Sequence, residues 1–325
     1  MVVGLTYDLR SDYLKEGFSE EETAEFDKEE TVAAIETALQ ELGYSTDRIG
    51  HVRQLVKRLA KGDRWDMVFN ICEGMYGIGR EAQVPALLDA YNIPYTFSDT
   101  LILALTLHKG LTKNVVRDCG VPTPDFTVVS SKKDIASVSL PYPLFIKPVA
   151  EGTGKGINAK SKVDNPAELE KVCLELLPNY SQGLIIETYL PGREFTVAIV
   201  GTGEDARSLG TMEVIFNQNA EAHGYSYLNK EFYEDRVTYR IVDEPVARAC
   251  EDVALSAWRV LSCRDGGRVD LRLDRDGVPG FMEVNPLAGL NPVRSDLPII
   301  CRLQGINFKE LIGMIMVSAQ KRMKT

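Results

Sequence analysis

The sequence lacks the features that would place it in a membrane or hold it together with disulfides. It has no apolar run of the ~18 residues that a spanning helix needs, and its N-terminus shows neither the basic start nor the long apolar core of a signal peptide. Its six cysteines lie far apart without a Cys-x-x-Cys pair, and its three histidines are scattered, which argues against a disulfide framework and against zinc. We therefore expect a cytoplasmic protein with reduced thiols and no membrane partner.

Positive charge is also scarce. The chain has 37 Lys and Arg residues against 47 Asp and Glu residues, a net charge of −10. Because nucleic-acid affinity comes largely from basic side chains that displace counterions, this balance argues against a nucleic-acid partner. The charge is concentrated in residues 8–30, the acidic segment, where ten acidic and three basic side chains leave −7 and the rest of the chain only −3. The whole chain is 44% hydrophobic, a composition typical of globular proteins. Its 325 residues are enough for two or three domains.

The order of the predicted elements indicates an α/β fold. Val2–Tyr7 and residues 65–72 are typical of buried strands, residues 93–97 (IPYTF) resemble another, and helical patterns separate them. Strands that alternate with helices predict a parallel sheet in an N-terminal domain of roughly 100 residues. The rest of the chain mixes strands and helices, α+β in part, and ends in a helix that Asn307 and Glu310 introduce as a capping box.

Residues 268–285 predict a β-hairpin that gathers acidic side chains. Asp276-Gly277 signals a two-residue turn, which pairs Asp270 with Glu283 and Arg268 with Asn285. The period of two puts these four on one face and four apolar residues on the other: Val269, Leu271, Met282 and Val284. Two facing carboxylates repel each other unless a cation lies between them, and oxygen ligands suit Mg²⁺ shared with phosphates. The alternative is a solvated polar face with two unrelated acids.

A glycine-rich loop, Glu151-Gly-Thr-Gly-Lys-Gly156, follows the predicted strand that ends at Lys147. Glycines let backbone N–H groups approach an anion, and Thr153 and Lys155 add donors. The loop is not a Walker A sequence, because Val149 holds the earlier glycine position and Gly156 follows Lys155. Such a glycine cluster is also typical of an ordinary loop. Lys147 and Lys109 are candidates to reach a phosphate, with plain surface lysines as the alternative.

Residues 201–206 imitate a dinucleotide-binding fingerprint, the only feature that would favour a nicotinamide oxidoreductase. Two acids, Glu204 and Asp205, stand where the pyrophosphate would bind, and a strand is predicted next instead of a helix. We therefore predict a turn there.

Six segments resemble the ATP-grasp superfamily and, within it, the D-alanine–D-alanine ligases. In chain order they are NICEGMYGIGREAQVPALL, IPYTFSD, LHKGLTK, LFIKPVAEGTGKGI, IIETYLPGREFTVAI and GRVDLRLDRDGVPGFMEVNPLAGL. The resemblance runs from Trp65 to the C-terminus. It implies a three-domain ATP-grasp architecture with domains at residues 1–105, 106–190 and 191–325, and with ATP bound between the central and C-terminal domains.

The resemblance also implies roles for single residues in the nucleotide half. Lys109 and Lys147 would hold the phosphates of ATP, Glu187 and Leu190 the adenine, and Glu194 the ribose. Thr153 and Gly154 would cover the transferred phosphate. Asp270, Glu283 and Asn285 match the ligands of two Mg²⁺ ions, for which Mn²⁺ is an alternative, in agreement with the hairpin. The segment 217–236 takes the place of a mobile closing loop.

The implied activity is an ATP-dependent carboxylate–amine ligase that joins two amino acids through an acyl phosphate. Arg268 and Gly289 would stabilise the tetrahedral intermediate, and Ser295 would bind the acceptor carboxylate. The family further implies a homodimer. Two alternatives stay open: a ligase that makes a different dipeptide or amino-acid amide, and a non-catalytic ATP-binding regulator.

The amino-acid half departs from the family pattern. Glu73 stands at the position of the family's histidine, and the family's motif after the first strand is replaced by TYDLRSDY and the acidic segment. We therefore expect Glu73, and one of Asp8, Arg10 and Asp12, to contact substrate. The glutamates from Glu20 to Glu30 are expected to be solvated.

Overall fold

The computed structural model describes residues 1–221, 229 and 232–323, which form three β-sheets in succession along the chain. The N-terminal sheet is parallel, as predicted, with β1 (Val2–Tyr7) between β2 (Ser45–Gly50) and β3 (Met67–Ile71). Its helices are α1 (Arg10–Lys15), α2 (Glu29–Glu41), α3 (Val52–Ala60) and α4 (Gln83–Ala90), with a 3-10 turn η1 at Arg80–Ala82. The α/β prediction is therefore confirmed for this part.

Two details of the N-terminal prediction are wrong. Residues 93–97 are not a strand: Tyr95 forms only an isolated bridge with Val68. Pro94 has no N–H for a ladder, and Phe97 turns the chain with a φ of 71°. Strand β2 and helix α3 were not predicted, because the sequence of β2, STDRIG, is polar and its first four residues are only partly buried or exposed.

The central sheet is antiparallel, in the order β4 (Phe126–Val129), β7 (Leu184–Thr188), β5 (Leu144–Pro148), β6 (Lys162–Val163). Helices α7 (Lys132–Ala136) and α8 (Pro166–Leu176) cover one face. Two helices connect it to the N-terminal sheet, α5 (Thr100–Leu107) and α6 (Lys109–Asp118), and the side chain of Asp99 caps α5 by accepting from the Ile102 N–H at 3.0 Å. The predicted domain boundary at 105 falls within α5, and the one at 190 in the connection from β7 to β8.

The C-terminal sheet is antiparallel and contains β10 (Val237–Ile241), β9 (Arg207–Phe216), β8 (Glu194–Val200), β11 (Gly266–Leu273) and β12 (Pro279–Asn285), in that order. Its helices are α10 (Tyr233–Arg236), α11 (Pro245–Val260), α12 (Asp296–Leu303) and α13 (Phe308–Met323). The predicted capping box before α13 is present, since the Glu310 carboxylate accepts from the Asn307 N–H and the Asn307 side chain from the Glu310 N–H. Residues 201–206 form the predicted turn, with a 3-10 segment η2 (Gly203–Asp205) ahead of β9.

The β11–β12 hairpin has the predicted pairing at its open end and a different turn. Asp270 pairs with Glu283 and Arg268 with Asn285, but the turn spans Asp274 to Val278, and only its glycine, Gly277, takes a positive φ. A β-bulge next to Asp270 offsets the longer turn. Met282 lies at this bulge and lines a cavity beside Glu283, so its predicted place on the opposite face is wrong.

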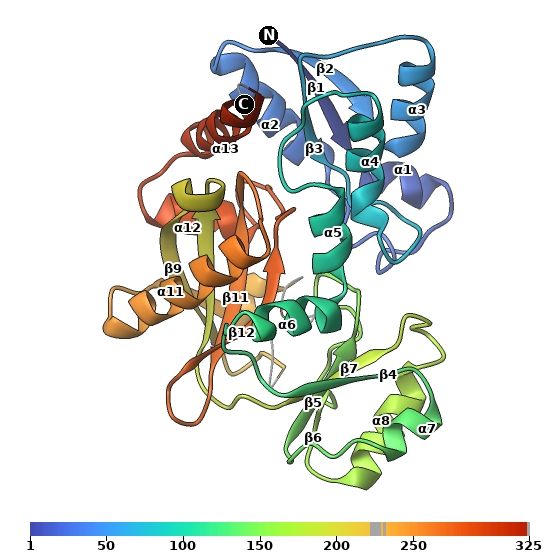
Figure 1. The fold of residues 1–325 in the computed structure, drawn as a ribbon, viewed down its shortest axis with the longest axis vertical. Coiled ribbons are helices and arrows are strands. Elements are labelled where there is room, and N and C mark those ends of the chain that lie inside the picture. The colour runs from blue at the N-terminus through green and yellow to red at the C-terminus, as the bar shows by residue number, and fades with distance from the viewer. Residues whose placement is uncertain (222–228, 230–231, 324–325) are drawn as a thin grey trace.

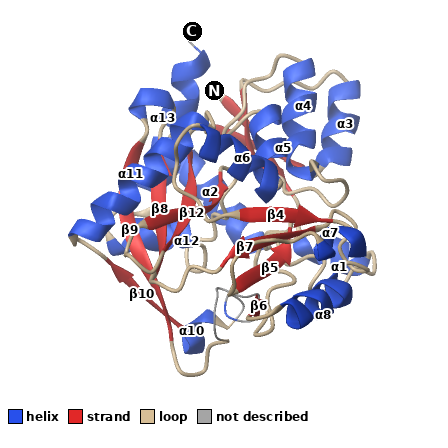
Figure 2. Ribbon diagram, turned by 60° about the horizontal axis from the view of Figure 1, so that its bottom comes forward, coloured by secondary structure: helices blue, strands red, loops and turns tan. Residues whose placement is uncertain are grey.

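The three sheets surround the middle of the molecule, with α5 and α6 between them (Figure 1). In a second view the strands of the central and C-terminal sheets converge below α6 (Figure 2). Helix α13 packs against α2, and the Gln320 amide donates to the Tyr44 hydroxyl at 2.9 Å, so both chain ends lie on the same side of the molecule. In the described part of the chain no helix is both long and apolar enough to cross a bilayer.

Candidate active site

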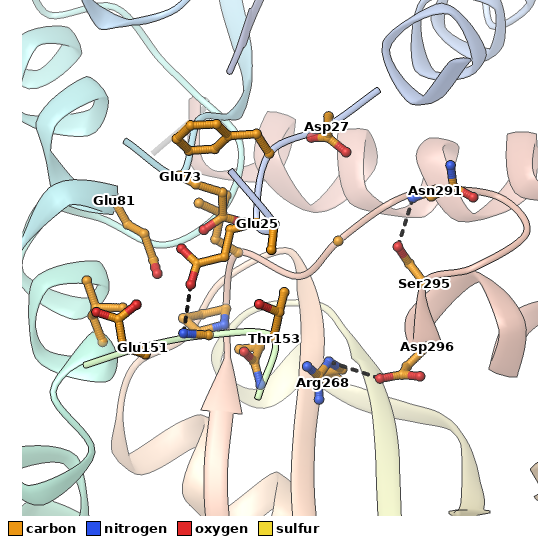
Figure 3. Close-up of a pocket in the computed structure, with 18 of the residues that line it drawn as sticks. Glu25, Asp27, Glu73, Glu81, Glu151, Thr153, Arg268, Asn291, Ser295 and Asp296 are labelled. Atoms are coloured by element: carbon orange, nitrogen blue, oxygen red, sulfur yellow. Dashed lines mark hydrogen bonds and ion pairs between the residues drawn. The ribbon is translucent and has the colours of Figure 1, made fainter. Parts of the chain in front are cut away.

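Two adjoining cavities lie where the three sheets meet. The smaller, of about 90 Å³, is the lysine cavity, and it lies between the central and C-terminal sheets. The larger, of about 280 Å³, is the acid cavity, which the N-terminal unit also lines (Figure 3). Lys109, Glu151, Gly152 and Glu283 line both cavities, so they form one continuous site.

The predicted residues divide between the two cavities. The lysine cavity is lined by eight of them: Lys109, Lys147, Gly154, Glu187, Leu190, Glu194, Asp270 and Glu283. The acid cavity is lined by Glu73, Thr153, Arg268, Glu283, Asn285, Gly289 and Ser295. Asp8 lines neither cavity.

The glycine-rich loop 151–156, the phosphate loop, separates the two cavities. Gly154 and Gly156 take positive φ values, and Thr153 adopts a φ of 49° that is uncommon for a residue with a side chain. The Thr153 hydroxyl is buried and has no hydrogen-bond partner within the described residues. An anion at this loop would supply one, because hydroxyls and backbone N–H groups are donors.

Glu187 binds two lysines in the lysine cavity. Its carboxylate lies 2.7 Å from Lys113 Nζ and 2.8 Å from Lys147 Nζ, and Glu187 and Lys113 are fully buried. Burial would raise the pKa of Glu187, but the two lysine charges outweigh it and hold the pKa below its ordinary value. Glu187 lies within β7 and lines the lysine cavity, its carboxylate is engaged in these ion pairs, and its place beside the adenine stays a prediction. Lys113 was missed, although it follows Lys109 by one helical turn.

The far end of the lysine cavity is aromatic. The Phe145 and Tyr189 rings stack with centroids 6.3 Å apart, and the Arg272 guanidinium lies 4.9 Å from the Tyr189 centroid. Arg272 also pairs with Glu194 at 3.4 Å. Tyr189 and Leu190 lie in the connection between the central and C-terminal sheets. Together with Phe145 they form an aromatic and apolar part of the cavity wall, against which the flat ring of a nucleotide base can pack.

The hairpin places two carboxylates and one amide beside the phosphate loop. Asp270 pairs with Arg268 and accepts from the Thr196 hydroxyl at 2.9 Å, whereas Glu283 lies 3.5 Å from Lys109 Nζ. The Asn285 side-chain nitrogen is buried without a hydrogen-bond partner among the residues described. No three acidic, His or Cys side chains of the described chain converge as a complete metal site. This oxygen-rich but incomplete set fits Mg²⁺, which keeps water and substrate phosphates as further ligands.

Arg268 faces the acid cavity from β11. It pairs with Asp270 and with Asp296 at 3.6 Å, and these carboxylates outweigh the effect of burial and raise its pKa above the ordinary value. Ser295 accepts a hydrogen bond from the Asn291 N–H at 3.0 Å, and a Cβ added at Gly289 would lie 2.9 Å from its hydroxyl oxygen. A larger residue at position 289 would therefore displace the Ser295 hydroxyl from its present position.

Acidic side chains from the N-terminal unit gather at the opposite wall of this cavity (Figure 3). Burial together with Glu81 and Glu25 raises the pKa of Glu73 well above its ordinary value. Burial, opposed by Arg80 and reinforced by Glu25, raises the pKa of Glu81 to about 7. Burial and the charge of Asp8 raise the pKa of Asp27 to about 7. A positively charged group bound at this wall would favour the ionised carboxylates and lower these pKa values.

The acidic segment is placed differently from the prediction. Glu25 is not solvated: its side chain is 7% exposed and pairs with Arg80 at 2.8 Å, whereas Glu20, Glu21 and Glu22 are exposed as predicted. A contact 55 residues away leaves no local pattern in the sequence, which is why it was missed.

Of the three residues after the first strand that were candidates to contact substrate, only one lines the acid cavity. Asp8 is buried and accepts from the Gly74 N–H at 2.9 Å and from the Tyr13 hydroxyl at 2.5 Å, so it fixes the backbone next to Glu73 and does not reach the cavity. Asp12 is exposed and pairs with Lys15, whereas Arg10 lines the acid cavity. The predicted closing loop at 217–236 lies partly outside the described residues, including Lys230 and Glu231.

Comparison with known proteins agrees with this geometry. The family model "D-ala D-ala ligase C-terminus" matches residues 115–317. A D-alanine–D-alanine ligase of Aquifex aeolicus is 31% identical over 287 residues, 88% of this chain and 93% of that protein. The fold is similar to a D-alanine–D-alanine ligase of Bacillus anthracis complexed with ATP, at a TM-score of 0.75, 20% identity and coverage of 100% and 99%. It is also similar to the VanG D-Ala:D-Ser ligase of Enterococcus faecalis, at a TM-score of 0.74, 18% identity and coverage of 98% and 99%. The chain belongs to the D-alanine–D-alanine ligase family, and its architecture is the ATP-grasp fold.

Proposed function

We propose that the protein is an ATP-dependent ligase that joins the carboxylate of one amino acid to the amine of a second through an acyl phosphate. Membership of the D-alanine–D-alanine ligase family supports a peptide-bond-forming ligase. The observation that carries the proposal is the continuity of the two cavities across the phosphate loop, because a γ-phosphoryl group held there would lie beside a carboxylate in the acid cavity.

In the first step the lysine cavity would hold ATP. Lys109 and Lys147 would neutralise its phosphates, and the phosphate loop would supply the Thr153 hydroxyl and backbone N–H groups. Asp270, Glu283 and Asn285 would hold Mg²⁺, which would offset phosphate charge as the carboxylate attacks the γ-phosphorus and ADP leaves with the bridging oxygen. Tyr189 and Leu190 are proposed to contact the adenine, and Glu194 the ribose.

In the second step an amine attacks the acyl carbon and inorganic phosphate leaves. Arg268, with the Gly289 backbone N–H, would stabilise the developing oxyanion, since a buried guanidinium remains charged throughout. Ser295 would hold the carboxylate of the acceptor amino acid. These roles come from the family pattern, and the position of the three residues on one wall of the acid cavity supports them.

The test is phosphate release from ATP with D- and L-amino acids, singly and in pairs, combined with mass spectrometry of the product. We expect release that requires Mg²⁺ and two amino acids, and a dipeptide product. ATP binding without phosphate release for any pair would favour a non-catalytic regulator instead.

The acid wall favours a second candidate, a ligase for a dipeptide whose first residue carries an additional amine. Glu73, Glu81 and Asp27 line the acid cavity, and a second ammonium group bound among them would favour their ionised forms and lower the pKa values that burial and neighbouring acids raise. The same screen should include ornithine and 2,3-diaminopropionate in both chiralities. A higher kcat/KM for these than for alanine would favour this candidate, and a preference for alanine would exclude it.

A further inference from the structure

Glu25, Arg80 and Lys155 form a charge network on the phosphate loop, which we call the Glu25 clasp. Glu25 Oε1 accepts a hydrogen bond from the Gly152 N–H at 2.7 Å and lies 3.3 Å from Lys155 Nζ. Glu25 Oε2 lies 2.8 Å from Arg80 Nη2, and Arg80 Nη1 donates to the Ala150 carbonyl at 3.0 Å. The clasp therefore contacts Gly152 and Lys155 of the loop and Ala150 directly before it, and both Glu25 and Arg80 come from the N-terminal unit.

The three side chains of the clasp are buried, and the carboxylate of Glu25 is paired with two side chains of opposite charge. The side chains of Glu25, Arg80 and Lys155 are 7%, 9% and 11% exposed. Burial alone would raise the pKa of Glu25, but Arg80, Lys155 and the Gly152 N–H lower it to about 2, so the carboxylate is charged at any working pH. Breaking such a pair costs far more than breaking an exposed one, because it leaves a charge buried without compensation.

The clasp lies directly before the strained part of the loop. A Cβ at Gly152 would lie 2.8 Å from Glu25 Oε1, so any larger residue there would displace the Glu25 carboxylate from its present position. The next residue, Thr153, holds a left-handed backbone conformation, which persists only where the surroundings impose it. Glu25 contacts the loop from the acid cavity, while Gly152 and Lys155 also line the lysine cavity.

We propose that Glu25, held by Arg80, is a positioning residue that fixes the phosphate loop for phosphoryl transfer. This inference rests on the proposed function. Glu25 acts through Gly152 and Lys155, and not on the reacting atoms. One residue of the acidic segment thus transmits the position of the N-terminal unit to the loop that covers the transferred phosphate.

The test compares Glu25→Gln with Glu21→Gln, an exposed glutamate of the same segment. Glu25→Gln preserves shape but removes the charge. We expect its kcat for phosphate release to fall at least tenfold while the KM for each amino acid changes less than threefold, and Glu21→Gln to match the wild type within twofold. A kcat of Glu25→Gln within twofold of wild type would overturn the proposal.

Two further measurements keep the test decisive. In a double-mutant cycle, Arg80→Gln should lower kcat like Glu25→Gln, and the double variant should be no worse than either, since both act through one contact; multiplying losses would overturn the proposal. If Glu25→Gln does not fold by circular dichroism, Glu25→Asp replaces it, because it retains the charge but falls one methylene short of the Gly152 N–H. The same tenfold loss is expected, and wild-type kcat would overturn the proposal.

Hydrogen exchange separates failure of this inference from failure of the proposed function. The amides of residues 152–157 should exchange at least tenfold faster in Glu25→Gln than in the wild type or in Glu21→Gln. This readout needs no turnover, so it applies even if the wild-type protein releases no phosphate with any amino acid. Unchanged exchange in Glu25→Gln would overturn the proposal.

Discussion

Replacing Glu187 by Gln should destabilise the protein more than any substitution of an exposed acid. Glu187 and Lys113 are fully buried and Lys147 is 5% exposed, so the three charges of this cluster sum to +1 in a buried region. Glu187→Gln keeps the shape and raises the sum to +2. Removing one partner of a buried pair costs about 3–5 kcal/mol, and we expect a loss in this range.

The structure also predicts the order of three variants. Lys113→Met leaves the Glu187–Lys147 pair neutral, and the Phe281 carbonyl retains its bond from the Thr123 hydroxyl at 2.8 Å. Lys113→Met should therefore cost only about 1–2 kcal/mol, the value of its lost hydrogen bonds. The double variant Glu187→Gln/Lys113→Met leaves one uncompensated lysine instead of two, so it should be more stable than Glu187→Gln alone.

Urea-induced unfolding followed by circular dichroism measures this order. Glu170→Gln is the matched control, because Glu170 forms an exposed pair with Lys132 whose side chains are 48% and 72% exposed, and it should cost at most about 1 kcal/mol. The reasoning would be refuted by a loss below about 1 kcal/mol for Glu187→Gln, or by a double variant less stable than Glu187→Gln.

Three other predictions concern the site. Asp270→Asn should reduce phosphate release at least tenfold, about 1.4 kcal/mol of barrier, since it removes a proposed Mg²⁺ ligand; a smaller loss would contradict that assignment. Ser295→Ala should raise the KM for the acceptor amino acid roughly 10- to 100-fold, the value of a hydrogen bond to a charged group, with the KM for ATP unchanged; an equal rise in both would count against the assigned role. The pKa of Glu81, about 7 when folded against an ordinary 4.5, means that its protonated form stabilises the fold fully below pH 4.5 and that this contribution is lost as pH rises through 7. The unfolding free energy of the wild type should therefore fall relative to Glu81→Gln by up to roughly 3 kcal/mol between pH 4.5 and 8, and a difference independent of pH would refute the shift.

In the β11–β12 hairpin the sequence predicted the facing side chains of the site correctly although it predicted the turn wrongly. Asp276-Gly277 predicted a two-residue turn, and the turn is longer. Asp270 nevertheless faces Glu283, because a bulge restores the predicted register over the last part of the ladder. The alternation of polar and apolar residues correctly predicted which side chains face each other at the site. The turn determines the register only at the opposite end of the hairpin.

The contacts that sequence could not provide are long-range ion pairs. Glu25 and Gly152 are 127 residues apart, and neither belongs to a periodic pattern that points to the other. Lys113 differs, because its spacing of four from Lys109 puts both lysines on one helix face, and this signal was available. Local patterns thus located the hairpin and the glycine-rich loop but missed β2, and the pairing of charges between the three sheets required the fold.

The separation of charge across the phosphate loop explains why the acidic segment is compatible with an ATP site. ATP carries several negative charges, and any of Asp27, Glu73 and Glu81 that is ionised would repel it. Lys147 and Lys155 line the lysine cavity and not the acid cavity, and Lys109 borders both, so the lysines that suit phosphates lie at the loop or beyond it. Only residues of the dividing wall, such as Gly152 and Glu283, border both. Lys109 and Lys147 pair with Glu283 and Glu187, so under the proposed function the acids of the N-terminal wall leave these two lysines to the nucleotide.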